Sequence, residues 1–145
     1  MSILATPLRP WTNETDAKLK TQKRKTHDNI MAQFMYLIRN EGADFSKYSA
    51  TDFQELNKKY QAWTEKIKTE GRFLAGEKLT KDLGKSLRIK QREIVVDGPY
   101  AESKEAIAGF YLIEADNLSE ALEFGKGCPA LSYGGSLEVR EIDQM

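Results

Sequence analysis

The side chains with the best claim to chemistry gather around Asp97-Gly98-Pro99-Tyr100, a segment that lies between two apolar runs. Glycine tolerates backbone angles that other residues resist, and proline fixes φ and lacks a donor, so the segment predicts a shaped turn. Asp97 could serve as a general base or accept a hydrogen bond, and Tyr100 could donate one to a substrate oxygen. Asp97 is therefore the best candidate for a catalytic residue. The plainer alternative, that its carboxylate bonds its own turn backbone, stays open.

Other candidates flank this turn or face it from a predicted helix. Tyr60 and Trp63 belong to an apolar helical stripe, where core packing is the ordinary role and a ligand-facing hydroxyl on Tyr60 is the alternative. Glu102 and Lys104 follow the turn, where solvated or weakly ion-paired side chains are the ordinary expectation. The expected ligand-binding set is Tyr60, Trp63, Asp97, Tyr100, Glu102 and Lys104, with Arg72 and Glu77 nearby.

Metal and nucleophile chemistry have little support. The chain has one histidine, His27, and one cysteine, Cys128. This excludes an internal disulfide and a multi-cysteine zinc site, and it does not favour a histidine-based metal site or a Ser-His-Asp triad. Cys128 has no plausible base nearby in the sequence, so we expect a small buried or half-buried thiol. We predict neither a metal site nor a cofactor.

Length and composition indicate one ordinary globular domain. The chain has 145 residues, of which 40% are hydrophobic and 30% charged, a balance typical of folded proteins. No apolar run approaches the roughly 20 residues that span a bilayer, and the first residues lack the apolar core of a signal peptide. We therefore expect a cytoplasmic protein without a membrane segment.

Charge divides the chain into a polar N-terminal arm, residues 1–30, and a body, residues 31–145. The arm carries six Lys/Arg against three Asp/Glu, whereas the body has an acidic excess of three. A short basic run, Lys23-Arg24-Lys25, is the only hint of nucleic-acid binding. Because net charge is zero and the body is acidic, the sequence does not favour direct binding to nucleic acid.

Periodicity predicts two helices among several strands. Spacings of three and four indicate a long helix that begins at Ser49 or Thr51 and ends near Glu70, and a second helix follows Asp116 with Leu118, Ala121, Leu122 and Gly125 on its inner side. Gly76 suggests a bulge or a close approach of another group. The expected strands are 32–39, 73–79, 87–90, 94–96, 107–115 and 136–142.

This order predicts an α+β fold of the ferredoxin-like βαββαβ type, in which two helices cover one face of a sheet. Strands 32–39 and 107–115 are nevertheless apolar on both faces, so something must cover the second face. A second copy of the chain and the N-terminal arm are the two possibilities. Because the arm offers too little apolar area, we expect a homodimer packed through the open sheet face, with the arm as an added contributor.

Several ordered motifs resemble the DGPF-type branch of YCII-related proteins. They span residues 31–142, and the name-giving motif reads Asp-Gly-Pro-Tyr here, with a tyrosine in place of phenylalanine. The motifs are Trp63-Thr-Glu, Glu70-Gly-Arg-Phe-Leu-Ala-Gly-Glu77, Val96-Asp-Gly-Pro-Tyr-Ala-Glu-Ser-Lys-Glu105, Gly109-Phe-Tyr-Leu-Ile-Glu-Ala-Asp116, Glu120-Ala-Leu-Glu and Gly135-Ser-Leu-Glu-Val-Arg140.

The resemblance implies a dimeric α+β barrel whose function is largely uncharacterised. In the wider group a histidine on the first helix and an acidic residue have been suggested as a catalytic dyad. The histidine position corresponds to Tyr60 here, and an Asp-Pro after the second helix corresponds to Cys128-Pro129. We therefore expect a small-molecule-binding homodimer with at most weak enzymatic activity. The alternative is a non-catalytic regulatory module linked to transcription, because some relatives occur with extracytoplasmic-function sigma factors.

Overall fold

A computed structural model describes residues 30–40, 44–98 and 106–145 of the chain. In these ranges the succession of strands and helices agrees with the predicted one, and a short 3₁₀ helix, η1, is added after the second helix. The elements are β1 (Ala32–Arg39), α2 (Ala50–Thr69), β2 (Phe73–Lys78), β3 (Ser86–Lys90), β4 (Glu93–Asp97), β5 (Ile107–Ala115), α3 (Leu118–Gly125), η1 (Pro129–Tyr133) and β6 (Ser136–Glu141).

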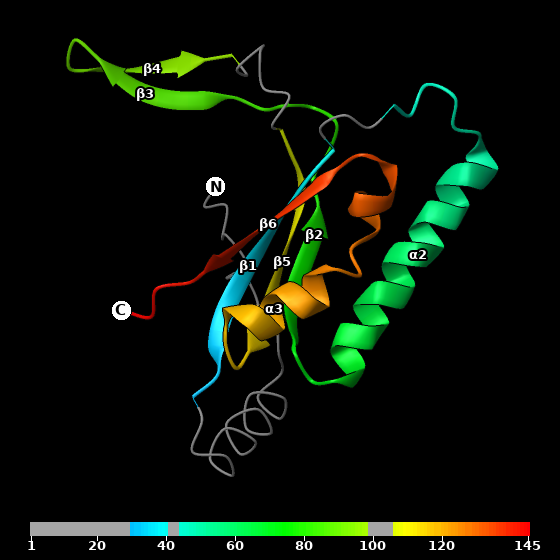
Figure 1. Cartoon of the computed structure of the whole chain (residues 1–145). Coiled ribbons are helices and arrows are strands. Elements are labelled where there is room, and N and C mark those ends of the chain that lie inside the picture. Colours follow the sequence, from blue (N-terminus) through cyan, green and yellow to red (C-terminus); the bar gives the residue numbers. More distant parts are fainter. Residues whose placement is uncertain (1–29, 41–43, 99–105) are drawn as a thin grey trace, which may run out of the picture.

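Four strands form an antiparallel sheet in the order β2-β5-β1-β6. Helices α2 and α3 lie on the same side of this sheet (Figure 1). An antiparallel sheet with its helices on one face is an α+β architecture, and it is compatible with the predicted ferredoxin-like fold. None of the helices in the described ranges is long and apolar enough to cross a membrane.

The core lies between the sheet and α2. Along β1, the side chains of Phe34, Tyr36 and Ile38 are buried, whereas Met35 and Leu37 on the opposite face are only partly buried. This alternation confirms the prediction that β1 is apolar on both faces. Met35 lies opposite Leu112, and Leu37 opposite Phe110, so the partly buried side chains of β1 and β5 form one apolar strip.

Helix α2 begins and ends where its sequence predicts. The Ser49 side chain accepts a bond from the Asp52 amide, and the Asp52 carboxylate accepts one from the Ser49 amide, a capping box that selects Ser49 as the start. Glu70 is the C-cap, and Gly71 follows with φ 70°, the left-handed angle for which glycine is suited.

Helix α3 packs closer to the sheet than its apolar pattern suggests. A Cβ on Gly125 would lie 2.9 Å from Cδ2 of Leu137, so only a small residue fits there. Ala121 and Gly125 are accordingly buried. The expectation that Leu118 and Leu122 also face inward is wrong, since these side chains are 48% and 46% exposed. The close approach of the helix reserves its inner side for small residues.

Strands β3 and β4 form a two-stranded sheet of their own. Gln91 and Arg92 connect them with positive φ angles of 50° and 69°, as in the tight turns that suit the twist of a hairpin. The strands predicted at residues 87–90 and 94–96 therefore pair with each other as a hairpin. In Figure 1 it extends from the upper end of the four-stranded sheet, away from α2.

The close approach predicted at Gly76 is confirmed. A Cβ there would lie 2.6 Å from the ring of Tyr111 on the neighbouring strand. The irregular register of β2 falls between Phe73 and Ala75, just before the glycine.

Candidate functional site

Polar side chains from distant parts of the sequence meet between α2 and the sheet. The hydroxyl of Tyr60, on α2, lies 2.5 Å from the hydroxyl of Tyr133, the last residue of η1. Tyr133 donates to Oδ1 of Asn40, directly after β1, over 3.2 Å. Because Tyr133 uses its hydrogen on Asn40, Tyr60 must donate to Tyr133. The two hydroxyls therefore form a directed chain of hydrogen bonds.

Cys128 adjoins this chain. Its thiol is 3% exposed and unpaired with another cysteine, which confirms the prediction of a small buried thiol. The thiol interacts with the Tyr60 side chain. Tyr60 is the residue that corresponds to the helix histidine of the similar proteins. Tyr60 and Cys128 lie 68 positions apart in sequence, yet the fold brings the two departures from the suggested dyad together. We call Asn40, Tyr60, Cys128 and Tyr133 the hydroxyl–thiol cluster.

Burial keeps the cluster neutral. Burial raises the pKa of the Cys128 thiol to about 11, and weaker interactions with the Ala130 backbone and the Tyr60 side chain oppose this shift. Burial also raises the pKa of Tyr60, and the hydrogen bond to Tyr133 adds to that shift. The pKa of Tyr133 is raised by burial too, partly offset by its bond with Tyr60. At neutral pH the cluster therefore presents protonated hydroxyls and a thiol rather than a base or a nucleophilic thiolate.

Aromatic rings form the wall beside the cluster. The indole of Trp63 is nearly parallel to the ring of Tyr111, with centroids 4.9 Å apart, and to the ring of Tyr36, at 5.9 Å. Its Nε1 donates to the carbonyl of Phe124 over 2.9 Å, so the polar atom of this buried ring is satisfied. The Phe45 ring packs against Tyr133 on the other side, with centroids 5.2 Å apart.

Tyr111 is also tied to α2 through its hydroxyl. Thr64 donates to the carbonyl of Tyr60 over 2.7 Å, so the Tyr111 hydroxyl, 2.6 Å away, donates to Thr64. No buried side-chain nitrogen or oxygen in the described part of the chain lacks a hydrogen-bond partner. A ligand at the hydroxyl–thiol cluster would therefore have to replace an existing bond.

The predicted site residues separate into two places. Tyr60 and Trp63 lie together, with ring centroids 6.4 Å apart. Asp97 ends strand β4, where its carboxylate pairs with Arg88 at 2.9 Å and Lys90 at 3.6 Å, both on β3. Asp97 therefore belongs to the hairpin of β3 and β4, which forms a sheet separate from the four-stranded one in the described part of the chain. Figure 1 shows this hairpin apart from α2. Tyr100, Glu102 and Lys104 lie outside the described residues.

Arg72 contributes to the anchoring of α3. Its guanidinium pairs with Glu120 at 3.1 Å and with Asp116 at 3.5 Å. Glu120 in turn accepts a bond from the Asp116 amide and completes the cap begun by Asn117. Arg72 therefore holds the start of α3 against β2. Glu77, the other residue expected nearby, is exposed on the edge strand β2.

The periodicity of the sequence does not identify Asn40 or Tyr133 as site residues. Asn40 directly follows β1 and Tyr133 is the last residue of η1, and the pattern of neither element points to a functional site. The sequence singles out Cys128 as the one cysteine and by its alignment with the Asp-Pro of the resemblance, but neither signal places it beside Tyr60. In the described ranges no group of three His, Cys, Asp or Glu side chains is placed to hold a metal ion.

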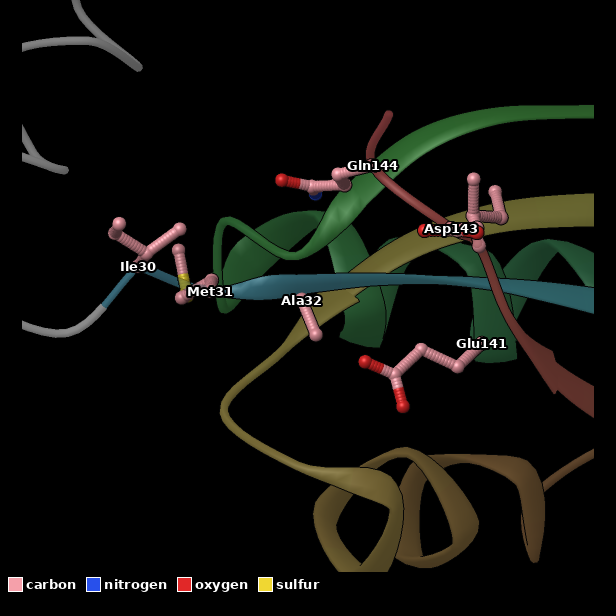
Figure 2. Close-up of a pocket in the computed structure, with 7 residues that line it drawn as sticks. Ile30, Met31, Ala32, Glu141, Asp143 and Gln144 are labelled. Atoms are coloured by element: carbon pink, nitrogen blue, oxygen red, sulfur yellow. The ribbon is translucent and has the colours of Figure 1, made fainter.

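A separate hollow of about 470 Å³ lies where the start of β1 meets the chain after β6. Figure 2 shows Ile30 and Met31 on one side of the group of lining residues, and Glu141 and Asp143 on the other. Among the predicted site residues that the structure describes, none lines this hollow. Its two carboxylates belong to Glu141 and Asp143, which are both exposed.

Comparison with known proteins gives two matches. A family model described as the YCII-related domain matches residues 32–145. An uncharacterised protein of Rhizobium meliloti (strain 1021) is 50% identical over 50 residues, which make up 34% of this chain. The match spans 40% of the length of that relative.

Proposed function

The chain belongs to the YCII-related family, and on this premise we propose that it is a homodimeric small-molecule-binding protein whose ligand site is the hydroxyl–thiol cluster. The observation that carries the proposal is the meeting of Tyr60, Tyr133 and Cys128 between α2 and the sheet. Helix α2 supplies Tyr60, whereas Cys128 and Tyr133 lie at the start and the end of η1. Hydrogen-bonding groups set among aromatic rings are typical of small-molecule sites.

The neutrality of the cluster defines the ligand class. A charged ligand would have to leave water with no opposing charge among these four side chains, which is costly. A neutral aromatic compound with a hydrogen-bond acceptor, such as an aromatic amide, matches both the hydroxyl donors and the rings of Trp63 and Tyr111. Such a ligand would accept the bond that Tyr60 now donates to Tyr133.

The same neutrality opposes acid–base catalysis. A general base works best with a pKa near the operating pH. The tyrosine and thiol pKa values are all raised by burial, so none of these groups exchanges its proton readily near pH 7. Binding without proton transfer is the function that these residues support.

The sheet face opposite the helices supplies the proposed dimer contact. Met35 and Leu37 on β1 and Phe110 and Leu112 on β5 are apolar and only partly buried there. Packing a second copy against this strip would remove it from water, which is the main driving force of association.

A thermal-shift screen of neutral aromatic amides and aromatic carboxylates tests the ligand site. We expect amides to raise the melting temperature of the wild type and Tyr60→Phe to abolish this shift. Asp97→Asn is the matched isosteric control, and its ligand shift should equal that of the wild type. A shift that depends on Asp97 and not on Tyr60 would move the site to the hairpin. The absence of any hit would favour the interaction-module alternative.

A further inference from the structure

The hairpin formed by β3 and β4 has two chemically different faces. Its register places Leu87 opposite Val96 and Ile89 opposite Ile94. Because side chains alternate along a strand, these two apolar pairs share one face. The two pairs lie next to each other on that face, so their four side chains form a continuous apolar surface.

No part of the chain that the structure describes covers this surface. Leu87, Ile89, Ile94 and Val96 are respectively 71%, 73%, 74% and 62% exposed. Together they make an apolar patch on the order of several hundred Å², the size that marks a site of protein contact. Ile107, the only apolar side chain of β1 and β5 that is exposed in the structure, is 38% exposed, so the apolar side chains of the hairpin are much more accessible than those of the main sheet.

The opposite face of the hairpin is suited to water. Asp97 pairs there with Arg88 and Lys90, and Lys90 lies across from Glu93. Such charged pairs hold the two strands in register without needing cover. A hairpin with one polar and one apolar face is amphipathic, and an isolated two-stranded sheet is marginally stable in water unless its apolar face packs on something.

We propose that the hairpin is a clasp whose apolar face packs on a second copy of this chain. The proposal rests on the homodimer proposed above and names an additional contact within it. The hairpin extends from the end of the sheet away from α2 (Figure 1), so it does not fold back on its own helices. Each copy has the same uncovered hairpin and the same open sheet face, and a two-fold axis would bury both features in both copies at once.

The area required by a stable dimer supports the second copy as the occupant. Stable interfaces bury about 800 Å² on each partner. The strip of partly buried side chains on β1 and β5 is small for that purpose, since Met35, Leu37, Phe110 and Leu112 have lost most of their exposure already. The four hairpin side chains supply the missing apolar surface.

The experiment uses the full chain with Ile89→Thr/Ile94→Thr, which keeps the branched shape that strands favour and removes apolar surface. These side chains are 73% and 74% exposed, so the monomer should fold as before. Sedimentation velocity over a range of concentrations should show a dimeric wild type and a dissociation constant raised roughly tenfold or more in the variant. The matched control is Lys90→Thr/Glu93→Thr, which changes a cross-strand pair on the polar face. It should change the dissociation constant of the dimer less than threefold.

An environment-sensitive dye on Ile94→Cys gives a second readout. The only other thiol, Cys128, is buried, so labelling is directed to the hairpin. We expect the dye emission to shift to the blue as the protein dimerises. If Ile89→Thr/Ile94→Thr leaves the dimer unaffected and the dye emission does not shift, the hairpin is not part of the interface. This result would overturn the clasp but would not contradict a dimer formed through the sheet face. A wild type that is monomeric at every concentration would overturn both. Ligand binding is measured separately and does not depend on either result.

Discussion

The hydroxyl of Tyr60 lies 2.5 Å from the hydroxyl of Tyr133, although 73 positions separate the two residues in sequence. This bond links the middle of α2 to the last residue of η1, and through Asn40 to the end of β1. Three segments that the sequence gives no reason to associate thus share one hydrogen-bond chain. Its strength can be measured directly.

Removing one hydroxyl should cost stability. In Tyr60→Phe and Tyr133→Phe, the remaining hydroxyl loses a partner in a half-buried place, so we expect each change to lower the free energy of unfolding by about 1–2 kcal/mol. The double variant should lose less than the sum of the two, because the first change already breaks the shared bond. Urea denaturation of the wild type and all three variants measures this coupling. Strict additivity would show that the two hydroxyls do not interact.

Gly76→Ala should destabilise the sheet. The new methyl would lie 2.6 Å from the Tyr111 ring, which is itself held between Trp63 and Thr64. Overpacking of this kind costs about 1–3 kcal/mol. Gly98→Ala is the matched control, since no atom lies within 4 Å of its added Cβ. Thermal unfolding of the two variants should separate them, and equal melting temperatures would contradict the close packing at Gly76.

The turn of the hairpin should be improved by a different pair of residues. Gln91 and Arg92 both have positive φ, a conformation that costs residues with a Cβ on the order of 1 kcal/mol. Gln91→Asn/Arg92→Gly supplies the pair that such turns prefer, so the β3 and β4 amides should exchange more slowly with solvent deuterium. Arg92→Val should speed that exchange, because branched side chains resist this conformation. Equal exchange in all three proteins would show that the turn does not limit hairpin stability.

Alkaline pH should weaken the fold through Cys128. Burial raises the thiol pKa from 9.0 to about 11, so between these values the unfolded chain loses a proton that the folded protein keeps. The unfolded state then binds fewer protons, and the free energy of unfolding falls as pH rises, by roughly 2–3 kcal/mol in total from this group. Below about pH 9 the thiol contributes no pH dependence.

Cys128→Ala isolates that contribution. Unfolding free energies measured by urea from pH 7 to 11 should fall less steeply in the variant than in the wild type. The tyrosines, whose pKa values burial also raises, should leave a residual decline in both proteins. Parallel pH profiles would indicate that the folded protein does not suppress ionisation of the thiol.

The sequence predicts the elements well because their signals are local. The capping residues Ser49 and Asp52 and the stop at Gly71 define α2 without reference to the rest of the chain. The alternation of side chains along β1 is likewise a local signal, and it correctly predicts that both faces of this strand are apolar. Packing distance is not local, however, and the orientation of Leu118 and Leu122 was mispredicted because α3 approaches the sheet closely at Gly125.

The candidate site was harder to predict for the same reason. Tyr60 and Trp63 share a helix face, so their proximity follows from helical spacing. Cys128 and Tyr133 come close to them only through tertiary folding. The short helix η1 has no hydrophobic periodicity by which the sequence could predict it. Asp97 looked prominent because its turn motif is conspicuous, yet its carboxylate is paired along the hairpin with Arg88 and Lys90.

The near-parallel stacking of Trp63 with Tyr36 and Tyr111 gives the molecule an internal optical reporter. Light absorbed by either tyrosine should pass to the indole by energy transfer, and the buried indole should emit at short wavelength. The second tryptophan, Trp11, lies outside the described residues, and Trp11→Phe would leave Trp63 as the sole emitter. Displacement of α2 from the sheet would then appear as a fluorescence change, without any attached label.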